Sequence, residues 1–137
     1  MMTTIYLSAE EKLLFEKLPE TLRDGWITEE ETKTADDTFE QRLVRMQLMH
    51  LRDPKLQAIL KLVSESSSID QVVNVIQSQD LTHIDNADLS ELFFALGPTV
   101  ISALILFLLK SVKTDKDIEG IVALTLIRNK LLVAFNL

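Results

Sequence analysis

Apolar residues recur along most of the chain at spacings of three and four, the period that places them on one face of an α-helix. The spacing is clearest in the segments "TFEQRLVRMQLMHLR" and "IDQVVNVIQ". No long stretch alternates apolar and polar residues, as a half-buried strand would. The pattern therefore predicts an all-α fold: a compact multi-helix bundle of about seven or eight helices, forming a single helical domain over residues 1–137.

Capping signals divide this pattern into separate helices. In each of four pairs, a side chain at the helix start and another three residues later can accept hydrogen bonds from free backbone N–H groups. The pairs are Ser8 with Glu11, Thr28 with Glu31, Ser68 with Gln71, and Thr114 with Asp117. Asp53-Pro54 adds a capping aspartate followed by a first-turn proline, and Asp24-Gly25 indicates a turn.

Residues 92–109, "LFFALGPTVISALILFLL", contain no charge and raise the question of a membrane span. As one helix they would reach roughly 27 Å, enough for a bilayer core. Gly97-Pro98 divides the run, and the remaining residues 98–109 cover only about 18 Å. We therefore favour a buried antiparallel hairpin of two apolar helices, 98–109 and 115–135, at the centre of the bundle. Gly120 in the second helix either permits a close helix–helix approach or is a tolerated defect.

The helix predicted over residues 28–52 has three faces on a helical wheel. One apolar stripe holds Phe39, Leu43, Met46 and His50, and a second holds Val44, Leu48 and Leu51. The remaining face holds Arg42, Arg45, Met49 and Arg52. Two apolar stripes need cover from two sides, either from two neighbouring helices or from the fold and a second molecule. The arginines are either a solvated face paired with nearby carboxylates or a docking site for an acidic partner.

Composition and charge narrow the class of protein. The 137 residues are 47% hydrophobic and 26% charged, which is typical of a folded soluble domain. The net charge of −7 and the pI of about 4.8 disfavour general binding to nucleic acid. The absence of cysteine suits a reducing compartment, and the N-terminal segment lacks the features of a signal peptide, so we expect a cytoplasmic protein.

Residue patterns that carry chemistry are scarce. The chain has two histidines, His50 and His83, and it contains no Glu-x-x-His or His-x₃-His pair; His50, on an apolar stripe, is typical of a core residue. Residues 80–91 resemble the outline of a calcium-binding loop, but Ile84 offers no ligand oxygen and Asp85 stands where a glycine is required. Asp85 or Asn86 is better placed to cap the next helix. We expect no enzymatic activity, no cofactor and no metal.

The leading functional hypothesis is a non-catalytic helical protein–protein interaction module. It self-associates as a homodimer, or binds another protein, through the 28–52 helix. The partner-binding residues are then Val44, Leu48 and Leu51, flanked by Arg42, Arg45, Met49 and Arg52. One alternative is a carrier of an apolar ligand in a pocket between the two C-terminal helices, lined by large side chains such as Phe93, Phe94, Phe107 and Met46. Another alternative is a membrane-associated helical protein.

Overall fold

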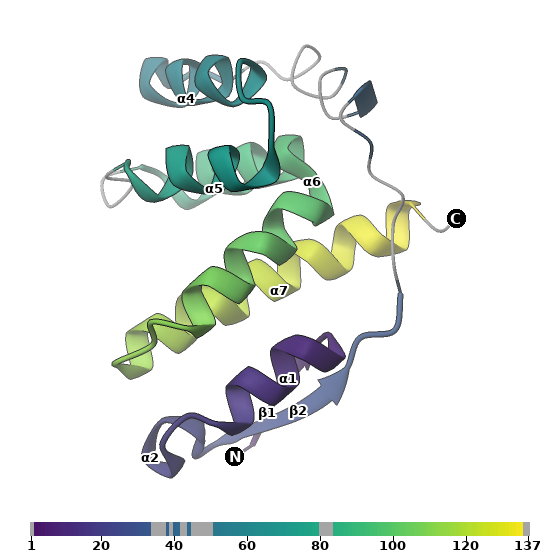
Figure 1. Cartoon of the computed structure of the whole chain (residues 1–137), viewed down its shortest axis with the longest axis vertical. Helices are drawn as coiled ribbons and strands as arrows, with labels where there is room; N and C mark the ends of the chain where they lie inside the picture. The colour runs from purple at the N-terminus through teal and green to yellow at the C-terminus, as the bar shows by residue number, and fades with distance from the viewer. Residues whose placement is uncertain are drawn as a thin grey trace. The chain divides into compact units, whose positions relative to one another are not determined.

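The computed structural model describes residues 2–33, 38, 40, 41, 44, 51–79 and 84–135. Within these residues the chain forms six helices and two strands (Figure 1). In order, they are β1 (Thr3–Leu7), α1 (Ala9–Glu16), α2 (Glu20–Arg23), β2 (Trp26–Glu30), α4 (Pro54–Ser64), α5 (Ile69–Gln77), α6 (Asn86–Leu109) and α7 (Asp115–Phe135).

The prediction of an all-α fold of seven or eight helices is wrong in two respects. The described residues hold six helices, and they include a two-stranded parallel sheet formed by β1 and β2. Each strand is only five residues long, too short for alternation to stand out from the helical pattern. The coarser prediction, a mostly helical protein, is confirmed.

Close contacts divide the chain into two compact units. Unit 1 comprises Met1–Ala35 and Leu104–Leu137, and unit 2 comprises Asp36–Ala103. Unit 1 is therefore built from both ends of the sequence, and unit 2 from the segment between them. The single domain expected over residues 1–137 stays a prediction.

Unit 1 begins with a β–α–β segment. β1 pairs with β2 in parallel, with Thr3 opposite Trp26 and Leu7 opposite Glu30. α1 contacts both strands, and α7 packs against β1 (Figure 1). Burial alternates along β1, because Ile5 and Leu7 are buried whereas Tyr6 between them is exposed. The sheet therefore has one covered face and one face that reaches solvent.

Two of the three capping boxes predicted in unit 1, at Ser8 and Thr114, are confirmed, as is the turn at Asp24-Gly25. The Glu11 backbone N–H donates to Ser8 Oγ at 3.3 Å, and the Ser8 N–H donates to Glu11 Oε1 at 2.9 Å, so both halves of the capping box are present. The turn expected at Asp24-Gly25 places Gly25 at φ +89°, a conformation that glycine adopts without strain. Thr114 and Asp117 form the box expected before α7.

α7 buries one stripe of side chains along its length. The stripe consists of Ile118, Ile121, Leu124, Thr125, Arg128, Leu131 and Leu132. Its spacing of three and four residues is that of a helix covered on one side. Gly120 lies off this stripe, and a Cβ added there would meet no described atom within 4 Å. Of the two roles considered for Gly120, the structure therefore supports a tolerated defect rather than a close approach.

Unit 2 contains α4, α5 and the first part of α6. α4 and α5 pack together, and Leu56, Ile59 and Val63 of α4 and Val72 and Ile76 of α5 are buried. The predicted caps are present in both helices: Asp53 Oδ1 accepts from Lys55 N at 2.8 Å, and Ser68 Oγ accepts from Gln71 N at 3.2 Å. Asp85 caps α6 in the same way, through the Ala87 N–H at 2.9 Å.

The uncharged run is interrupted where the sequence predicts. α6 is assigned as one helix, but Gly97 inside it has φ 87° and ψ 172°, which is not helical. Residues 86–96 and 98–109 are therefore two helical segments, each of roughly 17–18 Å at 1.5 Å per residue. By length and composition alone, Ala87–Leu109 is the one helix among the described residues that could cross a membrane, and 56% of its most apolar window is buried.

The predicted 28–52 helix has incorrect bounds at both ends. Thr28 lies inside strand β2, and residues 51–53 are not helical. Thr28 with Glu31 has capping spacing, but pairing with β1 prevails over this local signal. Thr38 and Gln41 form a capping box instead, with Gln41 N donating to Thr38 Oγ1 at 3.1 Å and Thr38 N donating to Gln41 Oε1 at 3.0 Å.

Candidate functional site

Strand β2 has an open edge in the part of the chain that the structure describes. Thr3 N donates to Gly25 O at 2.9 Å, and Glu31 N donates to Leu7 O at 2.7 Å. With the parallel register, these bonds fix which residues of β2 face β1: Ile27 and Glu29 do so. The backbone N–H and C=O groups of Trp26, Thr28 and Glu30 therefore point away from the sheet.

The opposite edge of the sheet, along β1, is covered. The same register directs the backbone groups of Thr4 and Tyr6 away from β2. α7 packs along this side, and Arg128 Nη2 donates to the Tyr6 carbonyl oxygen at 3.2 Å. The sheet therefore has one edge closed by a helix and one edge, β2, available for a further strand.

A buried ion pair holds α7 against the β–α–β segment. Arg128 Nη1 lies 2.7 Å from Glu11 Oε2, and Arg128 Nη2 lies 2.8 Å from Glu11 Oε1. Their side chains are 4% and 1% exposed, so both charges are removed from water. A two-pronged arginine–carboxylate contact fixes orientation as well as distance. Glu11 thus caps α1 and also anchors α7, which keeps β1 between α7 and β2.

A pocket of about 310 Å³ opens beside β2. Its lining residues come from β2, from the turn and the two helices that precede it, and from the residue before β1: Met2, Phe15, Glu16, Glu20, Arg23, Asp24, Gly25, Trp26 and Thr28. Phe15 is 3% exposed and forms an apolar floor, whereas Trp26 and Thr28 are half-buried walls. By register, Trp26 and Thr28 share the sheet face of the buried Ile5, which is the face that α1 covers.

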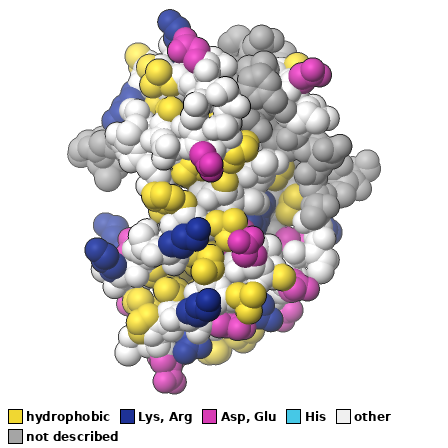
Figure 2. All heavy atoms as spheres, viewed as in Figure 1, with side chains coloured by type: hydrophobic (Ala, Val, Ile, Leu, Met, Phe, Trp, Pro, Cys, Tyr) yellow, Lys and Arg dark blue, Asp and Glu magenta, His cyan; other side chains and the backbone are white. Residues whose placement is uncertain are grey.

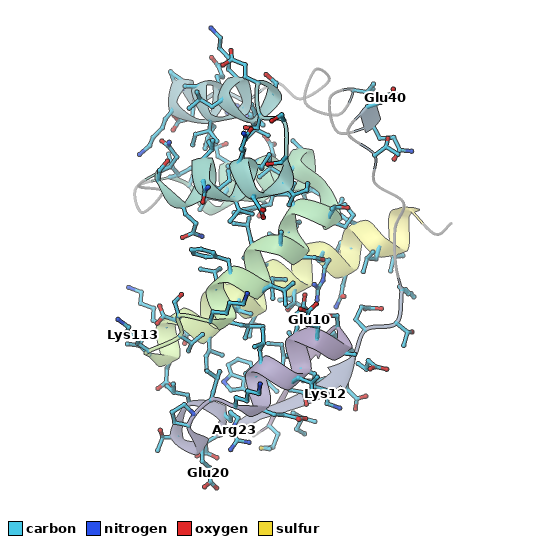
Figure 3. All side chains as sticks on the ribbon, in the orientation of Figure 1. Glu10, Lys12, Glu20, Arg23, Glu40 and Lys113 are labelled. Carbon is cyan, nitrogen blue, oxygen red and sulfur yellow. The ribbon has the colours of Figure 1, made fainter. Side chains whose placement is uncertain are left out.

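The rim of this pocket is acidic. Glu16, Glu20 and Asp24 are exposed carboxylates, and Arg23 is the one cation among the lining residues, which leaves a formal charge of −2. Arg23 Nε donates to the Leu18 carbonyl at 2.8 Å, so the guanidinium is held at one side of the rim. Figure 3 shows Glu20 extending outward from α2 with Arg23 beside it, while Glu10 lies at the far end of α1.

Acidic side chains continue along β2 beyond the pocket. Glu29 and Glu30 are exposed at the end of the strand, and the half-buried Glu31 follows. On the face drawn in Figure 2, by contrast, basic, acidic and apolar side chains are interspersed and no large basic patch is visible among the coloured residues. Among the described residues of unit 1, the edge of β2 thus combines acidic side chains with backbone groups that no described strand pairs.

The residues predicted to bind a partner are only partly described. Val44 is 54% exposed and Arg52 is exposed, whereas Leu51 is 4% exposed and its carbonyl accepts from Gln57 Nε2 at 2.6 Å. Val44 and Leu51 therefore do not share one accessible stripe. The other four predicted residues, Arg42, Arg45, Leu48 and Met49, lie outside the described residues.

The region proposed for an apolar ligand, next to the α6–α7 connection, contains a smaller pocket. Its volume is about 200 Å³, and it is lined by Leu108, Ser111, Lys116, Asp117 and Gly120. Phe93 and Phe94 are half-buried, Phe107 is 44% exposed, and Met46 lies outside the described residues.

Hydrogen bonds from the backbone N–H groups of Lys113 and Thr114 lower the pKa of the Asp117 carboxyl below its usual value. No cluster of metal-ligating side chains occurs among the described residues.

Sequence reasoning missed the open strand edge and its pocket. The available signal was weak: "TTIYL" and "WIT" are rich in β-branched and aromatic residues, and the second follows a glycine turn. No protein-family model, curated protein or solved structure matches the chain.

Proposed function

We propose that the chain is a non-catalytic protein-interaction module that binds an extended, basic polypeptide segment along the open edge of β2. The observation that carries the proposal is the outward direction of the backbone groups of Trp26, Thr28 and Glu30, inferred from the register. A strand added at such an edge gains main-chain hydrogen bonds in a regular series. Isolated two-stranded sheets are marginally stable, so a third strand also stabilises the sheet that receives it.

The charge of the edge selects the partner. Glu29 and Glu30 lie on β2, and Glu31 follows it. A second copy of β2 on this edge would bring two acidic strands together, which is unfavourable. A segment carrying lysine or arginine gains from the same charges, both in rate of association and in specificity. We therefore expect a basic partner rather than a homodimer at this edge.

The test uses a nine-residue acetylated peptide that alternates valine and threonine and carries a central lysine. Trp26 is the single tryptophan of the chain and lies on the proposed edge, so its fluorescence reports binding. The decisive variant is Thr28→Pro, because proline removes the outward N–H without removing a bond to β1. Thr28→Val is the matched control, since it preserves the donor and the shape of the side chain.

We expect Thr28→Pro to abolish binding and Thr28→Val to retain it. A second pair of variants, Glu30→Pro and its control Glu30→Ala, makes the same comparison at another outward N–H. This pair is used if Thr28→Pro disturbs folding. Circular dichroism verifies that each variant is folded. Equal affinities for the folded proline and control variants would overturn the proposal, as would a failure of the wild-type chain to bind the peptide.

Light scattering on the purified chain addresses self-association separately. A dimer that persists in Thr28→Pro but dissociates in Val44→Glu would assign the partner surface to the stretch around Val44 and remove β2 from the interface. The homodimer through Val44, Leu48 and Leu51 stays a prediction, as does the apolar-ligand alternative.

A further inference from the structure

We infer that the pocket beside β2 receives a lysine or arginine side chain from the segment bound at that edge. This inference rests on the proposed function and deepens it, because it names the side chain that confers specificity. The pocket and the strand edge share Trp26 and Thr28, so a ligand on the edge necessarily borders the pocket.

Strand geometry directs one side chain of the segment toward the pocket. Trp26 and Thr28 have their side chains on the face that α1 covers, while their backbone groups point outward. A strand added about 4.8 Å away places its directly neighbouring residues on the same face. The residue opposite Trp26 or Thr28 therefore projects over the pocket of about 310 Å³.

The lining of the pocket fits a long side chain with a positive end. The half-buried Trp26 offers apolar surface against which an aliphatic stem or a guanidinium plane can pack, and the buried Phe15 adds only the small part of its ring that lines the pocket. The exposed carboxylates of Glu16, Glu20 and Asp24 stand at the rim, where the charged end would emerge. An acidic side chain would bring a like charge to these carboxylates, and a short one would not reach them.

Three peptides that differ only at the central residue test the inference. The central residue is lysine, norleucine or glutamate, where norleucine keeps the apolar stem and removes the charge. We expect norleucine to bind about two- to fivefold more weakly than lysine, since exposed ion pairs contribute modestly, and glutamate to bind more weakly still. If lysine and norleucine peptides bind equally well, the pocket does not recognise the charge and the inference fails while the strand-edge proposal stands. If none of the three binds, the proposed function itself fails.

Two protein variants locate the effect in the pocket. Glu16→Gln/Glu20→Gln removes two rim charges, and Glu10→Gln/Glu119→Gln removes two exposed charges of unit 1 that do not line the pocket. Both pairs change the net charge by the same amount. We expect only the first to erase the preference for lysine over norleucine. An equal reduction of this preference by both pairs would assign it to the overall field of the protein and overturn the inference.

Discussion

Replacing Arg128 by methionine tests how unit 1 is held together. Arg128→Met keeps a long side chain but removes the guanidinium that binds both oxygens of Glu11 and the carbonyl of Tyr6. Glu11 then remains 1% exposed with its charge, and its carboxylate keeps the hydrogen bond from the Ser8 N–H at 2.9 Å.

The expected cost is large because a buried charge loses its counter-charge. Breaking one side of a buried, hydrogen-bonded ion pair typically costs about 3–5 kcal/mol. Whole domains are stable by only about 5–15 kcal/mol, so Arg128→Met removes a substantial part of the free energy of unfolding. Glu11→Gln is expected to cost a similar amount, because it leaves the buried Arg128 guanidinium without its counter-charge. The double variant leaves no buried charge, so its cost should fall short of the sum of the single costs by at least about 1 kcal/mol.

Urea unfolding followed by Trp26 fluorescence measures these changes in the free energy of unfolding, and it does so in unit 1, which contains Glu11 and Arg128. The single tryptophan lies in unit 1, so its signal follows the packing of α7 and the sheet. Glu10→Gln and Lys130→Met are matched controls on the same two helices, and both should change stability by less than about 0.5 kcal/mol. A loss below about 1 kcal/mol for Arg128→Met, or strict additivity of the double variant, would show that the pair is not a buried, coupled contact.

Three further predictions concern backbone conformation and pH. Gly25→Ala should destabilise the chain by about 1–2 kcal/mol, because Gly25 has φ +89°. Gly120→Ala should stabilise the chain by about 0.5–1 kcal/mol, because a Cβ there meets no described atom within 4 Å. Urea unfolding measures both changes, and equal effects of the two substitutions would contradict the assigned conformations. Gly97→Ala should cost about 1–3 kcal/mol, because φ 87° and ψ 172° lie in a region open essentially to glycine, and a neutral result in thermal unfolding would indicate a continuous helix. The lowered pKa of Asp117 stabilises the folded state above the pKa of an unfolded aspartate, near 4, and that contribution is lost as the pH falls through the lower folded value. Asp117→Asn should therefore flatten the acid limb of a pH–stability curve, and an unchanged limb would refute the assignment.

The local signals of the sequence were reliable where a helix boundary depends on neighbouring residues. The caps at Ser8, Asp53, Ser68 and Thr114 and the break at Gly97 are confirmed. Each of these depends on groups within a few positions in the chain, so spacing alone identifies it.

Features that depend on distant residues were not predictable in the same way. Thr28 with Glu31 has the spacing of a capping box, but β1, more than twenty positions away, pairs with that segment as a strand. The contact between Glu11 and Arg128 joins residues 117 positions apart, and no local pattern relates them. The pocket and the open edge exist only because β1 and β2 pair in parallel, so the candidate site could not be located before the sheet was known.

The separation of Glu11 and Arg128 has a consequence for the order of events on the ribosome. Arg128 is added 117 positions after Glu11, and at about 5–20 residues per second this interval is roughly 6–23 s. Throughout that interval the Glu11 carboxylate lacks the Arg128 guanidinium that pairs with it in the folded unit. Unit 2, encoded between the two parts of unit 1, is complete earlier, so we expect nascent-chain folding to start in the middle of the sequence and to finish by bringing its two ends together.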